Sequence, residues 1–199
     1  VNEAGQIELL LGEGQSGNVV GGVSLAADAA TIAAQLIGQG IVESWVPPEL
    51  LEHLPESARN PLVVVSDPHV WAYNTEAYDA CPVSNVWQLV DPEWASRVAI
   101  MDPLDKANYA DWFNQLEENH DPAMAAAYEA HYGKPFDPAE GTATEVWVKG
   151  FAGNGVLLAD STGVAEAIRA AGQAAPFFGM LSTAKFRDNV DKGHKLGFC

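Results

Sequence analysis

The stretch from Val86 to Pro103 places a proline break, a short apolar run and a second proline break in close succession. Asp91-Pro92 ends the first part, because proline has no backbone N–H and disfavours the α region in the residue before it. The run Val98–Met101 then stops at Asp102-Pro103, which predicts a buried strand that opens into a loop. In α/β proteins, ligands gather at this carboxyl end of a strand, near the start of the next helix. The stretch therefore predicts an α/β protein with a binding loop after this strand.

Strand-like and helix-like segments alternate along the rest of the chain. The predicted strands are a segment from Val1 to Leu11, Pro61–Ser66, Val70–Asn74, Val98–Met101, Val156–Ala159 and Ala175–Leu181. The predicted helices are Leu25–Ile37, Lys106–Asn119, Asp121–Tyr132, Thr142–Phe151 and Gly163–Ala171. Such alternation is typical of α/β domains, so we predict a mostly parallel sheet.

The charge of the chain excludes two classes of partner. Lys and Arg together number 10 against 27 Asp and Glu, which gives a formal net charge of −17. A nucleic-acid-binding protein needs a basic face, and docking on anionic lipid needs basic clusters. We therefore expect no nucleic-acid partner and no binding to a lipid surface.

No apolar run approaches the roughly 20 residues that span a bilayer, and no signal peptide is visible. Because the first residue is Val rather than Met, we expect a processed product or a fragment. The two cysteines, Cys81 and Cys199, match no zinc-site or CxxC spacing. They could form one disulfide in an exported protein, or remain two buried thiols.

The common catalytic and metal-binding patterns are missing from this sequence. The five histidines form no HExxH motif and no i,i+4 pair, so we predict no metal site. A GxSxG nucleophile elbow is absent, and Cys81 precedes a proline in a polar loop that offers no activating neighbour. We therefore predict no catalytic residue and no cofactor.

Small polar groups stand at three predicted strand-to-helix junctions, Gly22-Val23-Ser24, Asp102-Pro103 and Asp160-Ser161-Thr162. Helix starts offer free backbone N–H groups and the positive end of a dipole, which attract anions. The glycines could instead form a tight turn, and the hydroxyls could simply cap their own helices. Three such junctions with aromatic residues nearby favour a binding cleft. The candidate ligand-binding residues are Gly22, Ser24, His69, Trp71, Asp102, Asn108, Tyr109, Asp160, Ser161 and Thr162.

Several motifs in this order resemble the extracellular solute-binding proteins of bacterial ABC importers, in the family that includes the ferric-ion-binding proteins. The motifs are NVVGGVSLAADAATIAAQLIGQGIVESWVPPE, then YNT, WQLVDPEW and MDP, and finally VWVKGFAGNGV, DST, VAEAI, PFFGMLSTAKFRDN and KGHKLG. The likeness runs from Asn18 to Cys199, and its motifs are moderately specific.

The resemblance implies a type II periplasmic-binding-protein fold, in which two α/β lobes close on a ligand by a hinge. Residues 1–66 would form part of lobe one, 67–83 a hinge or crossover, 84–181 lobe two, and 182–199 a return toward lobe one. Family members extend beyond both ends of this sequence, so we expect lobe one to be incomplete here.

Ferric-binding members of the family use an adjacent Tyr-Tyr pair near the strand that here contains Phe177 and Phe178. Phenylalanine has no phenolate, so this departure disfavours iron. Lys106, Lys149, Lys185 and Arg187 are cations that could help to bind an anion instead, although solvation at the surface is the simpler role for each.

We therefore predict the substrate-binding component of an ABC import system, which captures a small organic or phosphorylated anion for a membrane permease and catalyses nothing. We expect it in the periplasm or tethered outside the membrane, and as a monomer. A ferric-iron receptor of the same family is one alternative. The other is a small α/β enzyme that uses His69 and a carboxylate at a strand end.

Overall fold

The computed structural model describes residues 3–17, 29–170 and 175–199, and it divides the chain into two compact units, Val1–Ser66 and Asp67–Cys199. Gly22 and Ser24 lie outside the described residues. The assignment of lobes and of a hinge at 67–83 stays a prediction.

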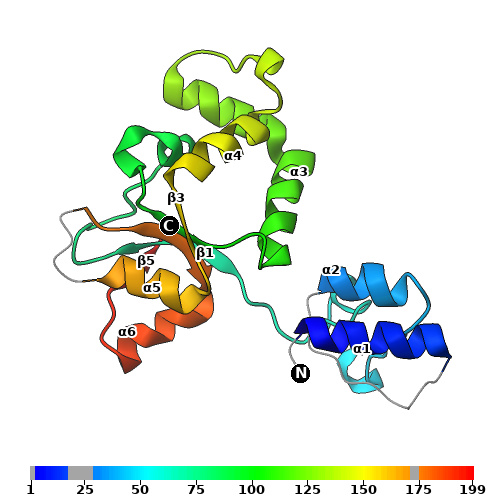
Figure 1. Cartoon of the computed structure of the whole chain (residues 1–199). Coiled ribbons are helices and arrows are strands. Elements are labelled where there is room, and N and C mark those ends of the chain that lie inside the picture. Colours follow the sequence, from blue (N-terminus) through cyan, green and yellow to red (C-terminus); the bar gives the residue numbers. More distant parts are fainter. Residues whose placement is uncertain (1–2, 18–28, 171–174) are drawn as a thin grey trace. The chain divides into compact units, whose positions relative to one another are not determined.

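The first unit is mainly helical among its described residues (Figure 1). It contains α1 (Glu3–Ser16), α2 (Ala29–Thr31), a π-helix η1 (Ile32–Ile37) and two 3₁₀ helices, η2 (Pro48–Leu50) and η3 (Glu56–Ala58). A small core joins α1 to η1 through Ile7, Leu10 and Leu36.

Two predicted strands of the first unit are wrong. The segment ending at Leu11 belongs to α1, because Ile7, Leu10 and Leu11 recur at the i, i+3 and i+4 spacing of one helical face. Pro61–Ser66 is not a strand, and Val64 and Val65 are each 77% exposed. A strand needs a neighbouring strand to pair its backbone N–H and C=O groups. The described part of this unit contains only one isolated β-bridge, between Arg59 and Leu62.

The second unit contains a five-stranded sheet in the order β3-β2-β4-β1-β5. Its strands are β1 (His69–Asn74), β2 (Val98–Met101), β3 (Gly155–Leu158), β4 (Phe178–Ser182) and β5 (Leu196–Phe198). β2 runs parallel to β3 and β4, whereas β1 runs antiparallel to β4 and β5. The sheet is therefore mixed rather than mostly parallel.

The helices of the second unit are α3 (Ala107–Tyr132), α4 (Ala143–Asn154), α5 (Ser161–Arg169) and α6 (Asp188–Asp191). The short 3₁₀ helices are η4 (Val86–Val90) and η5 (Pro92–Trp94) before α3, η6 (Pro138–Glu140) between α3 and α4, and η7 (Thr183–Arg187) directly before α6. Two helices were predicted where α3 is one. Pro122 lies inside it, and Figure 1 shows α3 changing direction along its length, as expected at an internal proline.

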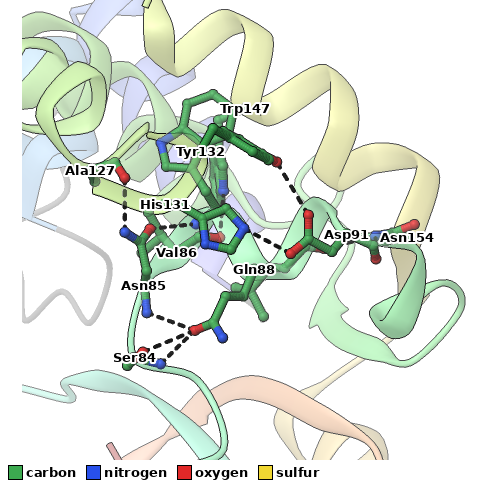
Figure 2. Close-up of polar contacts among 12 residues, drawn as sticks. Ser84, Asn85, Val86, Gln88, Asp91, Ala127, His131, Tyr132, Trp147 and Asn154 are labelled. Atoms are coloured by element: carbon green, nitrogen blue, oxygen red, sulfur yellow. Dashed lines mark hydrogen bonds and ion pairs between the residues drawn. The ribbon is translucent and has the colours of Figure 1, made fainter. Parts of the chain in front are cut away.

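Helix η4 and the polar residues on either side of it are fixed to α3 and α4 by hydrogen bonds (Figure 2). Asn85 and Gln88 cap η4 reciprocally, and the Asn85 amide also donates to the Ala127 carbonyl at 2.8 Å. At the other end, Asp91 accepts from the Tyr132 hydroxyl at 3.3 Å and lies 2.8 Å from Nε2 of His131. Burial and the Asp91 carboxylate raise the pKa of Tyr132 to about 12, so the hydroxyl keeps its proton at neutral pH.

The core lies on both faces of the sheet. On one face, α5 buries Val164, Ala165 and Ile168 against β2 and β4. Elsewhere in the same core, aromatic side chains of β1, β4, α3 and α4 pack together, with Phe178 stacked on Trp71 at 5.3 Å between ring centroids.

Gly179 in β4 makes the close contact between the sheet and α5 possible. A Cβ added there would meet the Ala99 carbonyl oxygen at 2.5 Å and Cγ1 of Val164 at 2.9 Å. We expect Gly179→Ala to lower the free energy of unfolding by about 1–3 kcal/mol, because the backbone of β2 cannot move aside without disturbing the sheet.

Gly153→Ala is the matched control, since nothing lies within 4 Å of its added Cβ. It should raise stability by about 0.5–1 kcal/mol. Urea denaturation would measure both, and equal effects would contradict the close contact.

Candidate functional site

Three strand-to-helix junctions of the second unit lie along one edge of the sheet, which we call the carboxyl edge. Because β2, β3 and β4 are parallel, their carboxyl ends point the same way, and the following helices begin at Ala107, Ser161 and Thr183. β1 is antiparallel, so its first residue, His69, lies opposite Ser182 at the end of β4. The carboxyl edge thus gathers the starts of three helices and the start of β1.

A short chain of hydrogen bonds joins these junctions. The Ser182 hydroxyl donates to Oδ1 of Asp67 at 2.5 Å and accepts from the Ala184 N–H at 3.1 Å. The Ser182 N–H donates to the Ser161 hydroxyl oxygen at 3.3 Å, and that hydroxyl lies 3.5 Å from Sδ of Met101. Both serines are buried. Their hydroxyls therefore hold the junctions together, and neither Asp67 nor Ser182 was predicted from the sequence.

A lysine approaches the start of α5. Nζ of Lys185 donates to the Thr162 hydroxyl at 2.8 Å, and Asp160 caps the helix by accepting from the Gly163 N–H at 2.8 Å. This backbone hydrogen bond is the main cause of a lowered pKa for Asp160, and the charges of Lys185 and Lys106 act in the same direction. At this helix start the Asp160 carboxylate therefore accepts backbone N–H groups of α5, while Lys185 places a cation beside Thr162.

Tyr109 and His69 lie on the inner side of the carboxyl edge. The Tyr109 hydroxyl donates to the Met180 carbonyl at 3.2 Å, and the two rings meet edge to face with centroids 5.3 Å apart. Burial raises the pKa of Tyr109, and the Asp67 carboxylate raises it further. Burial lowers the pKa of His69, with Asp67 partly opposing the shift. At neutral pH both groups are therefore mainly uncharged hydrogen-bonding partners.

The remaining predicted site residues of the described chain differ in their surroundings. Asp102 closes its own turn, since its Oδ1 accepts from the Leu104 N–H at 2.9 Å. Asn108 is exposed in the first turn of α3. Trp71 packs against the rings of Phe178, Phe151 and Trp112, so its contacts are those of the core. Its role in stacking on a ligand stays a prediction.

Phe177 and Phe178 do not lie at the carboxyl edge, so their lack of a phenolate says nothing about iron binding there. Phe178 opens β4, and its side chain is buried in the core, whereas the carboxyl edge lies at the other end of that strand, at Ser182. Among the residues that the structure describes, no three His, Cys, Asp or Glu side chains form a group that could hold a metal ion. Within the same residues, no helix is long and apolar enough to cross a membrane.

The mixed five-stranded sheet and its helices form the α/β fold of type II periplasmic binding proteins, as comparison with solved structures shows. Iron-bound HitA from Pseudomonas aeruginosa is 16% identical, with a TM-score of 0.64 over 99% of this chain and 57% of that chain. The apo ferric-ion-binding protein A of Pasteurella haemolytica is 12% identical, with a TM-score of 0.65 over 96% and 54%. Trichodesmium IdiA (FutA), in complex with iron and citrate, is 19% identical, with a TM-score of 0.65 over 100% and 59%.

The family model for bacterial extracellular solute-binding proteins matches residues 6–198. The chain therefore belongs to this family, and the resemblance seen in its motifs is confirmed. The family is one of binding proteins rather than enzymes, in agreement with our expectation. No curated protein sequence matches the chain significantly. The chain spans just over half the length of the solved structures compared above.

Proposed function

We propose that the chain forms part of the solute receptor of an ABC importer, acting outside the cytoplasmic membrane and delivering its solute to a membrane permease. Membership of the extracellular solute-binding family supports the receptor role. We expect the solute to bind at the carboxyl edge, because ligands of open α/β sheets bind at the carboxyl ends of strands. We further propose that the receptor is a monomer that binds no nucleic acid.

The solute that this edge fits best is a small organic or phosphorylated anion. The observation that carries this proposal is the start of α5, where Lys185 is hydrogen-bonded to Thr162, so that a cation lies at the positive end of the helix dipole. Asp160 and Asp102 stand at the same edge and could accept hydrogen bonds from hydroxyl or amine groups of the solute. The edge therefore fits a solute that carries both an anionic group and hydrogen-bond donors.

Ferric iron remains the second candidate, because three structures with this fold are named as iron-binding proteins or contain iron. A ferric ion needs anionic oxygen ligands. The phenol that the described structure places at the edge, Tyr109, is buried and donates to a carbonyl. This arrangement favours the anion over the metal.

A thermal-shift screen tests the proposal with inorganic phosphate, sugar phosphates, phosphonates, citrate and ferric citrate as probes. A ligand at 100 times its Kd adds about 2.7 kcal/mol, or roughly 5–10 °C for a chain of this size. A shift with a phosphorylated or carboxylated probe supports the anion receptor. A shift only with ferric citrate would replace it with the iron receptor, and turnover of a phosphate ester would favour an enzyme that uses His69.

Lys185→Gln should weaken binding of the anion about tenfold or more, because a charge-assisted contact contributes about 1.5–3 kcal/mol. Lys149→Gln, on the exposed side of α4, removes the same charge away from the edge and should leave Kd almost unchanged. Isothermal titration calorimetry of the two variants would measure the difference. An equal loss in both would show that only the net charge of the protein matters.

A further inference from the structure

A hollow of about 780 Å³ lies on the second unit between the later half of α3, the segment after it and the first turn of α4. Its position along the chain separates it from the carboxyl edge. α3 begins at that edge with Ala107, and Asp121, the first lining residue, follows 14 residues later, which is roughly 20 Å along a helix. The residues that define its chemistry are Asp121, Ala125, Glu129, Phe136, Pro138 and Glu145.

Three carboxylates and no basic side chain line the hollow. Two of the carboxylates are held in place, since Oδ1 of Asp121 accepts from the Thr144 N–H at 2.7 Å and Glu145 caps α4 by accepting from the Thr142 N–H at 3.2 Å. The side chain of Glu129 is exposed. The hollow is therefore negative, with two of its charges fixed in direction.

Apolar side chains make up most of the remaining lining. Phe136 packs edge to face on Tyr128 with ring centroids 5.3 Å apart. Ala125 and Pro138 add small or ring-locked apolar surface beside it. Nζ of Lys134, the cation next in sequence, lies over the Tyr128 ring at 5.8 Å from its centroid. A ligand would therefore meet carboxylates and an aromatic ring together.

We propose that this hollow binds a guanidinium group carried on an apolar body. The planar guanidinium presents its N–H donors in a fork that matches carboxylates, and its flat face also stacks on aromatic rings. The volume is in the range of small-ligand sites, so both the group and its apolar body can enter. A small guanidino compound and an exposed arginine of a partner protein share this chemistry.

Amide NMR of the ¹⁵N-labelled chain tests the proposal with three probes. Phenylguanidine represents the small compound, and acetyl-Gly-Arg-Gly-amide represents the partner arginine. Phenylurea is the uncharged control of the same shape. We expect chemical-shift changes confined to residues 121–145 with phenylguanidine and the peptide, at Kd values on the order of millimolar or below. Tighter binding of the peptide would assign the hollow to a partner protein, and tighter binding of phenylguanidine to a small compound.

Glu129→Gln and Glu118→Gln provide the matched variants, since both replace an exposed glutamate of α3 and only Glu129 lines the hollow. Glu129→Gln should weaken binding about threefold or more, and Glu118→Gln should change Kd by less than about a factor of two. Equal losses in the two variants, equal shifts with phenylurea, shifts outside residues 121–145, or no shifts at about 10 mM probe would each overturn the proposal.

Discussion

Replacing Cys81 and Cys199 together with serine is expected to lower the free energy of unfolding of the second unit by about 2–5 kcal/mol. The two cysteines form a disulfide between positions 118 residues apart, so the bond closes a long loop in the unfolded chain. If the disulfide acts by lowering the entropy of the unfolded chain, a loop of this length should give a stabilisation near the top of that range. Urea denaturation followed by tryptophan fluorescence would measure the loss.

The reduced wild-type chain is the control for this prediction. If the bond acts mainly by restricting the unfolded state, reduction should reproduce most of the loss caused by the double substitution, whereas reducing agent should leave the double variant unchanged. The Cys199 N–H also donates to the Trp71 carbonyl at 3.0 Å. The disulfide and this hydrogen bond therefore both hold the end of β5 in place. A double variant as stable as the oxidised wild type would contradict a stabilising role for the disulfide. From the sequence alone, a disulfide between the two cysteines and two separate thiols were equally possible.

The segments that were predicted correctly are those with local signals strong enough to decide their structure. The run Val98–Met101 is β2, and its four side chains are all buried. Thr142 caps α4 in a capping box with Glu145, so the predicted start of that helix is confirmed. Asp-Pro, glycine and capping residues mark such boundaries directly in the sequence.

Most of the wrong predictions concern features that tertiary structure decides. The segment before Leu11 is the exception: it was predicted as a strand, although Ile7, Leu10 and Leu11 already have the i, i+3 and i+4 spacing of one helical face. At Pro61–Ser66, β-branched residues indicated a strand, yet the described first unit offers no neighbouring strand. The antiparallel direction of β1 follows from its pairing with β4 and β5. The alternation of strands and helices along the sequence does not show which strands pair.

The candidate site was predicted in part because its residues lie at strand ends. His69, Asp102, Asp160 and Ser161 come together for this reason, since adjacent parallel strands share one edge and β1 starts at the same edge. Ser182 was missed because its predicted strand ended at Leu181, one residue too early. Asp67 was missed because its importance depends on a contact 115 residues away in the sequence. The roles of all these residues in binding stay predictions.

Trp87 is the side chain on which the packing of η4 against α3 depends. It is 2% exposed, and its indole N–H donates to the Met124 carbonyl at 2.9 Å. Its ring also meets Tyr128 edge to face at 4.9 Å between centroids. Pro122 costs α3 a backbone hydrogen bond close to this point, so contacts from outside the helix help to keep it continuous.

We expect Trp87→Ala to lower the free energy of unfolding by about 3–5 kcal/mol, because it removes a large buried side chain and leaves a cavity. Trp87→Phe keeps most of the volume and loses the hydrogen bond, so it should cost about 1–3 kcal/mol. Trp45→Ala is the control, since Trp45 is 71% exposed and its loss should change stability by less than about 0.5 kcal/mol. Urea denaturation followed by circular dichroism would compare the three variants without depending on tryptophan fluorescence. A loss for Trp87→Ala no greater than that for Trp45→Ala would show that η4 does not hold α3 in place.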